Sequence, residues 1–66
     1  MYIGKVKSFC DVRGFGFITL SDGRDVFAHQ TNIQIQGFRT LAVGSMVSFS
    51  LYETTKGLEA RDISNE

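Results

Sequence analysis

Two short segments carry the side chains of this chain that are best suited to binding chemistry. They are residues 13–18 (Arg-Gly-Phe-Gly-Phe-Ile) and 26–29 (Val-Phe-Ala-His). Successive side chains of a strand point to opposite faces, so the first segment's two phenylalanines share a face, as do Phe27 and His29. Glycine and aliphatic side chains remain for the opposite face, which suits a small core. We therefore predict exposed rings, which soluble proteins rarely keep without a use and which can stack on nucleic-acid bases.

No other group of side chains in the sequence points to catalysis or to a metal. His29 is the only histidine and Cys10 the only cysteine, so an internal disulfide is impossible and a zinc site is not expected. Cys10 is interpreted as a small loop or edge residue in preference to a reactive thiol. No serine, cysteine or carboxylate is spaced from His29 as nucleophilic catalysis would require. The sequence predicts a protein that is not an enzyme and that uses no cofactor, metal or small-molecule substrate.

The length and hydrophobic content favour one small folded domain spanning residues 1–66. Hydrophobic residues make up 42% of the chain, which is enough for a small core and argues against disorder. No apolar run approaches the ~20 residues that a membrane span needs, and no signal-peptide pattern is present. A cytoplasmic protein without membrane contact is the expectation.

The charged residues balance in number but not in position. Seven basic and seven acidic residues give a formal net charge of zero, which argues against a strongly basic binder of the histone type. Lys5, Lys7 and Arg13 adjoin the first aromatic segment, whereas acidic residues gather toward the C-terminus. We predict a basic flank beside the rings, with few phosphate contacts and a modest salt dependence of binding.

Five segments have the composition and alternation of short strands, namely 2–9, 15–20, 25–29, 47–51 and 58–63. The Asp-Gly pair within 21–24 predicts a hairpin turn, Thr31 or Asn32 could cap a single helical turn, and 34–44 is interpreted as a loop. Short strands at regular spacing indicate a sandwich or a barrel, and a closed barrel avoids open edges. The predicted core comprises Val6, Ile18, Val26, Ala28, Ile33, Val47, Phe49, Leu51 and Ile63.

These segments resemble the bacterial cold-shock protein family along nearly the whole chain, from residues 4–7 (Gly-Lys-Val-Lys) through 37–41 to 47–49. Residues 13–18 and 26–29 are similar to the family's first and second ribonucleoprotein motifs. The resemblance implies an all-β, five-stranded antiparallel barrel of the oligonucleotide-binding (OB) fold. RNA-recognition-motif domains share the first motif, but they need a strand, a helix and another strand before it. Only twelve residues precede Arg13, so we do not expect that fold.

The resemblance also implies a function, namely binding to single-stranded RNA or DNA, often as an RNA chaperone or regulator of gene expression. Position by position, it assigns base stacking to six residues, base-edge hydrogen bonds to Asp25, and contacts from the basic flank to Lys7 and Arg13. Lys56 is a weaker candidate for contact. The six stacking residues are Phe9, Phe15, Phe17, Phe27, His29 and Phe38.

The chain departs from the family pattern at two rings. The family has tryptophan before Phe9 and phenylalanine after His29, where this chain has Ser8 and Gln30. We expect weaker binding or binding over fewer nucleotides, although Gln30 can still hydrogen-bond a base edge. The departures also motivate an alternative, an OB module that binds a protein or forms a homodimer by exchanging strands through residues 34–44. A monomer is the leading expectation, and the choice between RNA and DNA stays open because stacking ignores the 2′-hydroxyl.

Overall fold

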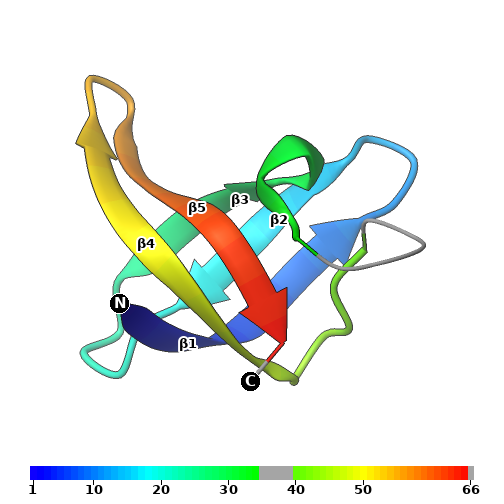
Figure 1. The fold of residues 1–66 in the computed structure, drawn as a ribbon, viewed down its shortest axis with the longest axis horizontal. Coiled ribbons are helices and arrows are strands. Elements are labelled where there is room, and N and C mark those ends of the chain that lie inside the picture. Colours follow the sequence, from blue (N-terminus) through cyan, green and yellow to red (C-terminus); the bar gives the residue numbers. More distant parts are fainter. Residues whose placement is uncertain (35–39, 66) are drawn as a thin grey trace.

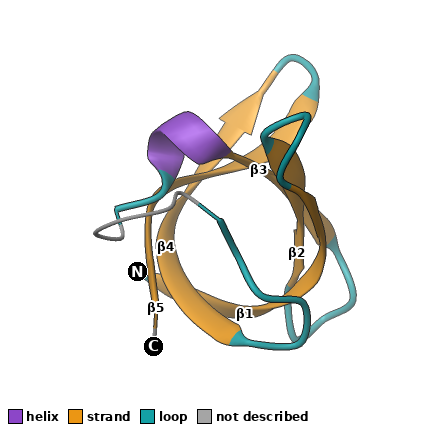
Figure 2. Cartoon of the chain, turned by 90° about the vertical axis from the view of Figure 1, so that its right-hand side faces the viewer, coloured by secondary structure: helices purple, strands orange, loops and turns teal. Residues whose placement is uncertain are grey.

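Short strands surround a buried aliphatic centre in the computed structural model, which describes residues 1–34 and 40–65. The strands are β1 (Tyr2–Cys10), β2 (Phe15–Thr19), β3 (Asp25–His29), β4 (Met46–Thr54) and β5 (Gly57–Asn65), with the 3-10 helix η1 (Gln30–Asn32) after β3 (Figure 1). They close into a barrel in the order β1-β2-β3-β5-β4, which Figure 2 shows from one end. This confirms the predicted all-β, five-stranded barrel, with β4 and β5 longer than expected.

The strand pairing is antiparallel around the barrel except at the seam that closes it. β1 pairs with β2 and β4, β2 pairs with β3, and β4 pairs with β5, all in antiparallel fashion. The seam is a short parallel pairing of β3 with β5, in which Phe27 lies opposite Glu59 and Ala28 opposite Ala60. Five strands in a closed ring cannot alternate in direction throughout, so one pairing departs from the antiparallel arrangement implied by the resemblance.

The buried core confirms the predicted list with one exception and three additions. Leu51 is half-buried and packs against the core, while Leu20, Leu41 and Ala60 join it. Leu41 belongs to the segment that leads into β4 and crosses one end of the barrel (Figure 2). Two backbone hydrogen bonds tie this segment to Val6, one from Gly44 N to Val6 O and one from Val6 N to Ser45 O. Leu41 therefore closes that end of the barrel.

A β-bulge in β1 changes which of its side chains face the core. Val6 lies opposite Ile18, but after a register shift Ser8 lies opposite Phe17 and Phe9 lies opposite Gly16. Because a bulge inserts one extra residue, the alternation of inner and outer faces changes beyond it. Ser8 thus takes the outer face and Phe9 the inner one.

The turn after β3 differs from its prediction. The helix η1 begins at Gln30, and its N-cap is His29, whose side chain accepts a hydrogen bond from the Thr31 amide. The prediction of Thr31 or Asn32 as the cap is wrong, because the imidazole Nδ1 reaches the amide two residues ahead.

The Asp-Gly turn is confirmed, with Gly23 at φ +91° between β2 and β3. Among the described residues, no helix is long and apolar enough to cross a membrane.

Candidate nucleic-acid interface

Four aromatic side chains form a continuous row on the outer face of β2 and β3. Phe15 lies opposite His29, and Phe17 lies opposite Phe27, in the antiparallel pairing of the two strands. The centroid of the Phe27 ring lies 5.7 Å from that of Phe15, 5.8 Å from that of Phe17 and 6.3 Å from that of His29. Phe27 is therefore the centre of the cluster. We call these four residues the aromatic row.

The rings of the aromatic row are partly open to solvent. Phe17 is 38% exposed, and the other three residues are half-buried. The opposite face of the same two strands is closed, with four buried residues: Gly16, Ile18, Val26 and Ala28. The predicted division of these strands into an aromatic outer face and an aliphatic inner face is confirmed.

The bulge in β1 decides what extends the aromatic row on its β1 side. Ser8 lies opposite Phe17, where it presents a hydroxyl in place of a ring. Phe9 lies opposite Gly16, is half-buried and packs against the core. Phe9 therefore does not share the face of the aromatic row, contrary to the position implied by the resemblance. The prediction for Phe38 falls outside the described residues.

A basic side chain covers one end of the aromatic row. The Arg13 guanidinium carbon lies 4.8 Å from the centroid of the Phe15 ring, within the range of a cation–π contact. Arg13 itself is exposed and lies in the loop just before β2. A guanidinium in this position can stack on a base or bind a phosphate.

Lys7 and Asp25, which were predicted as separate contacts to nucleic acid, bind each other. Lys7 Nζ donates to Asp25 Oδ2 at 2.9 Å, and Thr19 Oγ1 donates to Asp25 Oδ1 at 3.2 Å. The hydrogen bond from Lys7 holds the pKa of Asp25 below its ordinary 3.8, outweighing desolvation of the carboxylate. A lowered folded-state pKa stabilises the fold above pH 3.8, and this contribution is lost as the pH falls through the folded value. Both side chains are exposed, so the pair adds little stability.

The β4–β5 hairpin forms a wall beside the aromatic row. A cleft of about 520 Å³ lies between them. It is lined by Phe17, Asp25, Phe27, Thr54, Lys56, Gly57, Leu58 and Glu59. Lys56 lies in the exposed turn of the hairpin and is distant from the rings in sequence. Closure of the barrel therefore brings this predicted contact next to the aromatic row.

Polar side chains gather at the end of the aromatic row next to η1. His29 Nδ1 accepts a hydrogen bond from the Thr31 amide at 3.2 Å and lies 3.0 Å from Thr31 Oγ1, which fixes the imidazole. Gln30 N donates to Gly14 O at 2.8 Å. The Gln30 side-chain amide lies over Gly14, because a Cβ added to that glycine would meet Gln30 Cδ at 2.7 Å.

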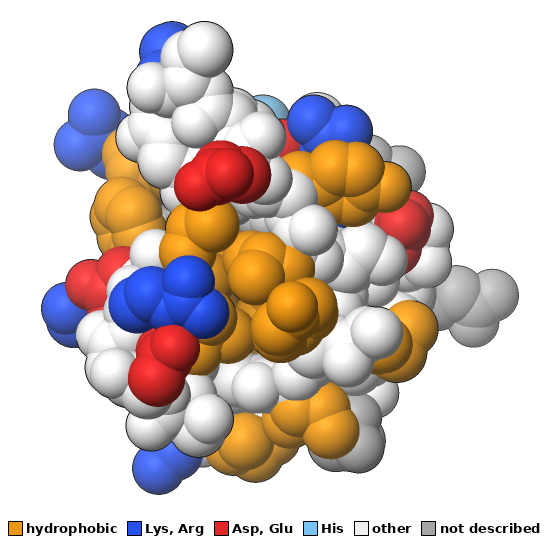
Figure 3. Space-filling view, turned by 90° about the vertical axis from the view of Figure 1, so that its left-hand side faces the viewer, with side chains coloured by type: hydrophobic (Ala, Val, Ile, Leu, Met, Phe, Trp, Pro, Cys, Tyr) orange, Lys and Arg blue, Asp and Glu red, His pale blue; other side chains and the backbone are white. Residues whose placement is uncertain are grey.

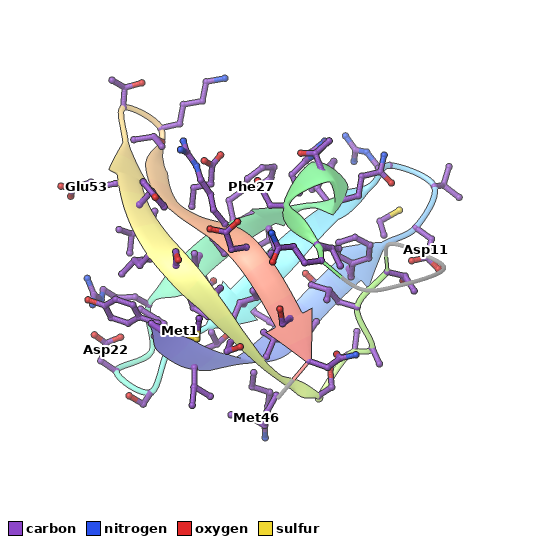
Figure 4. All side chains as sticks on the ribbon, viewed as in Figure 1. Met1, Asp11, Asp22, Phe27, Met46 and Glu53 are labelled. Carbon is purple, nitrogen blue, oxygen red and sulfur yellow. The ribbon has the colours of Figure 1, made fainter. Side chains whose placement is uncertain are left out.

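The charges around the molecule are mixed in sign. On the barrel end that carries the N-terminus, hydrophobic side chains gather at the centre, with basic and acidic side chains around them (Figure 3). Figure 4 places Phe27 well away from Asp22, at the β2–β3 turn, and from Asp11, in the β1–β2 loop. Near Phe27 itself, the cleft carries charges of both signs, from Asp25, Lys56 and Glu59.

Several residues near the candidate interface were not predicted from the sequence, among them Thr19, Thr31, Leu58 and Glu59. Thr19 could have been found, because strand alternation places it on the face of Phe17 and the hairpin register places it opposite Asp25. Thr31, which orients His29, could also have been found. It follows the histidine by two residues, a spacing at which its backbone amide can donate to the imidazole. Leu58 and Glu59 had no local signal, since only closure of the barrel brings them to the cleft.

Comparison with known proteins gives the family directly. The model of the 'Cold-shock' DNA-binding domain matches residues 2–66. The chain belongs to the cold-shock domain family. A cold shock-like protein of Thermotoga maritima is 45% identical over 60 residues, covering 91% of each chain. The cold shock protein CspB of Bacillus caldolyticus is 44% identical over 63 residues, covering 96% of each. Cold shock-like protein CspA of Stigmatella aurantiaca is 47% identical over 64 residues, covering 96% of this chain and 94% of its own.

A solved structure supports the fold independently. The barrel matches the drosophila Unr CSD456 structure with a TM-score of 0.80 at 23% identity, covering 98% of this chain and 26% of that longer one. At this identity the match shows the fold alone. Cold-shock domain proteins bind single-stranded nucleic acids and are not enzymes. Membership of this family confirms the predicted class of protein, a nucleic-acid-binding protein.

Proposed function

We propose that this cold-shock domain binds single-stranded RNA or DNA by stacking bases on the aromatic row, and acts as an RNA chaperone. The observation that carries the proposal is the row of four partly exposed rings on β2 and β3. Each stacked base contributes about 1–3 kcal/mol. Bases inside a duplex are already stacked on their neighbours, so an unpaired strand alone can use the row. A bound strand is then held open without ATP.

The surroundings of the aromatic row supply the remaining contacts. Arg13 and Lys56 lie at its borders and offer cations to the phosphates. Gln30 offers an amide to a base edge, and Phe38 stays a predicted stacking residue. Because Ser8 occupies the outer-face position opposite Phe17, the row gains no ring from β1. We therefore expect weaker binding than in a relative that has aromatic rings at the positions of Ser8 and Gln30.

The proposed function is tested by comparing single and double strands of equal length. Fluorescence anisotropy with a labelled heptathymidine and a labelled seven-base-pair duplex should show at least about 10-fold tighter binding of the single strand, because the duplex buries its base faces. A quenched RNA hairpin should also open and gain fluorescence when the protein is added. Equal affinity for the two strands, or no effect on the hairpin at saturating protein, would contradict the proposal.

The Lys7–Asp25 pair leads to a prediction about salt dependence. Asp25 holds the Lys7 ammonium at 2.9 Å, so a phosphate must compete with the carboxylate for it. We expect Asp25→Asn to tighten binding of heptathymidine and to steepen the slope of log K against log salt by about 0.7, one added phosphate contact on a single strand. Asp22→Asn is the control, since Asp22 pairs with Arg24 at 2.8 Å in the β2–β3 turn. Weaker binding by Asp25→Asn would instead show that the carboxylate accepts from a base edge.

One feature favours the alternative of a protein-binding or homodimerising module. An apolar groove of about 540 Å³ lies beside β1, and its lining includes Ile3, Val43 and Met46, which are all exposed. Gel filtration with and without an oligonucleotide separates the two candidates. A monomer that shifts only with nucleic acid supports the proposed function, whereas a dimer in its absence supports the alternative.

A further inference from the structure

Three polar side chains converge at the η1 end of the aromatic row. The Arg13 guanidinium lies on the Phe15 ring, and the His29 imidazole lies opposite Phe15 across the strand pair. Gln30 follows His29 directly and is exposed. At the other end, Phe17 and Phe27 share a cleft with the charged residues Asp25 and Lys56. We call the end of the aromatic row that is bordered by Arg13, His29 and Gln30 the polar end.

The Gln30 side-chain amide lies over Gly14 and is exposed to solvent. Its backbone is fixed by the hydrogen bond from Gln30 N to Gly14 O at 2.8 Å. A Cβ added to Gly14 would lie 2.7, 2.9 and 3.1 Å from Gln30 Cδ, Nε2 and Oε1, so the whole amide group packs on the glycine. Among residues 1–34 and 40–65, no side chain or backbone group hydrogen-bonds to this amide. Its N–H donors and its carbonyl acceptor are thus available to a ligand.

We infer that the polar end is a hydrogen-bonding subsite, in which Gln30 reads the edge of one base at the end of the bound strand. This rests on the proposed function. An amide presents a donor and an acceptor side by side, and it can form two hydrogen bonds to a base edge that carries the complementary pair. His29 and Arg13 bound the same position and supply the stacking surface. The rings of the aromatic row hold the other bases by their faces.

The inference is tested with a base that stacks but cannot form hydrogen bonds. Difluorotoluene has the shape of thymine without its hydrogen-bonding edge, and it replaces one thymine at a time in an oligothymidine. The strand used is the shortest oligothymidine that reaches full affinity in a length series. A strand of this length cannot shift along the aromatic row without leaving one ring uncovered, so each modified base keeps its position. We expect one terminal position to lose about 5-fold or more in affinity, the lower limit for a bidentate base contact. Replacement at internal positions should cost less.

The variant Gln30→Met assigns the effect to the amide. Methionine keeps the length of the side chain and removes its hydrogen bonds, so the terminal loss should disappear while internal positions behave as in the wild type. Gln34→Met is the matched control, because the Gln34 amide already bonds to Asp62 Oδ1 at 3.1 Å. A flat profile, or a terminal loss that survives in Gln30→Met, would overturn the inference. Failure of the unmodified oligothymidine to bind at all would instead overturn the proposed function.

Discussion

Gly16→Ala is expected to cost the barrel about 3 kcal/mol or more, at the upper limit for overpacking a core. A Cβ on Gly16 would lie 2.0 Å from Ser8 O and 2.6 Å from Phe9 Cα. Both atoms belong to the backbone of β1, so no side chain can rotate away to relieve the contact. The bulge places β1 directly over this glycine. In a chain of this size, 3 kcal/mol corresponds to a fall in melting temperature of about 12–24 °C.

Thermal unfolding followed by circular dichroism measures this loss, with Gly23→Ala as the control. Gly23 has φ +91° and no neighbouring atom within 4 Å of an added Cβ, so its substitution tests backbone strain without a steric contact. That variant should lose only about 1–2 kcal/mol. If Gly16→Ala melted at or above the temperature of Gly23→Ala, the close approach of β1 would be refuted as the reason for glycine at this position.

Phe27→Ala is expected to weaken binding of heptathymidine by about 10-fold or more. Phe27 contacts Phe15, Phe17 and His29, and it also lines the cleft beside the β4–β5 hairpin. Its removal therefore deletes one stacking surface and leaves the three remaining rings without their common neighbour. Anisotropy titration measures the loss, and circular dichroism verifies that the barrel is intact.

Tyr52→Ala is the matched control for the loss of an exposed ring. Tyr52 is 44% exposed on β4 and lies outside the aromatic row, with the Arg61 guanidinium carbon 4.3 Å from its centroid. Its removal should leave the affinity within about twofold, whereas Phe27→Leu should keep the apolar contacts and still lose the stacking. An unchanged affinity in folded Phe27→Ala would reject the stacking mechanism.

The fold and the centre of the candidate interface were predictable because both depend on local alternation. Period-two patterning in residues 15–19 and 25–29 placed the rings on one face and the aliphatic groups on the other. The Asp-Gly turn then fixed the register that aligns Phe17 with Phe27. Such signals lie within a few residues of one another, so they can be read without tertiary structure.

The rest depended on contacts that no local pattern records. The bulge between Val6 and Ser8 moved Phe9 to the inner face, and strict alternation from the start of β1 cannot foresee an extra residue. The pairing of Lys7 with Asp25 and the approach of Lys56 to the rings required the strands to be placed in space. Leu41 belongs to the core although its segment lacks the alternation of a strand. Its apolar side chain is removed from water because it covers the end of the barrel.

The parallel seam links occupancy of the cleft to the integrity of the barrel. Phe27 and Glu59 pair across this seam, and both line the cleft that also contains Lys56. If the seam opened, the two walls of the cleft would separate, so any ligand that touches both walls binds the closed form selectively. By mass action such a ligand raises the population of closed molecules. A bound single-stranded nucleic acid that touches both walls would therefore stabilise the closed barrel.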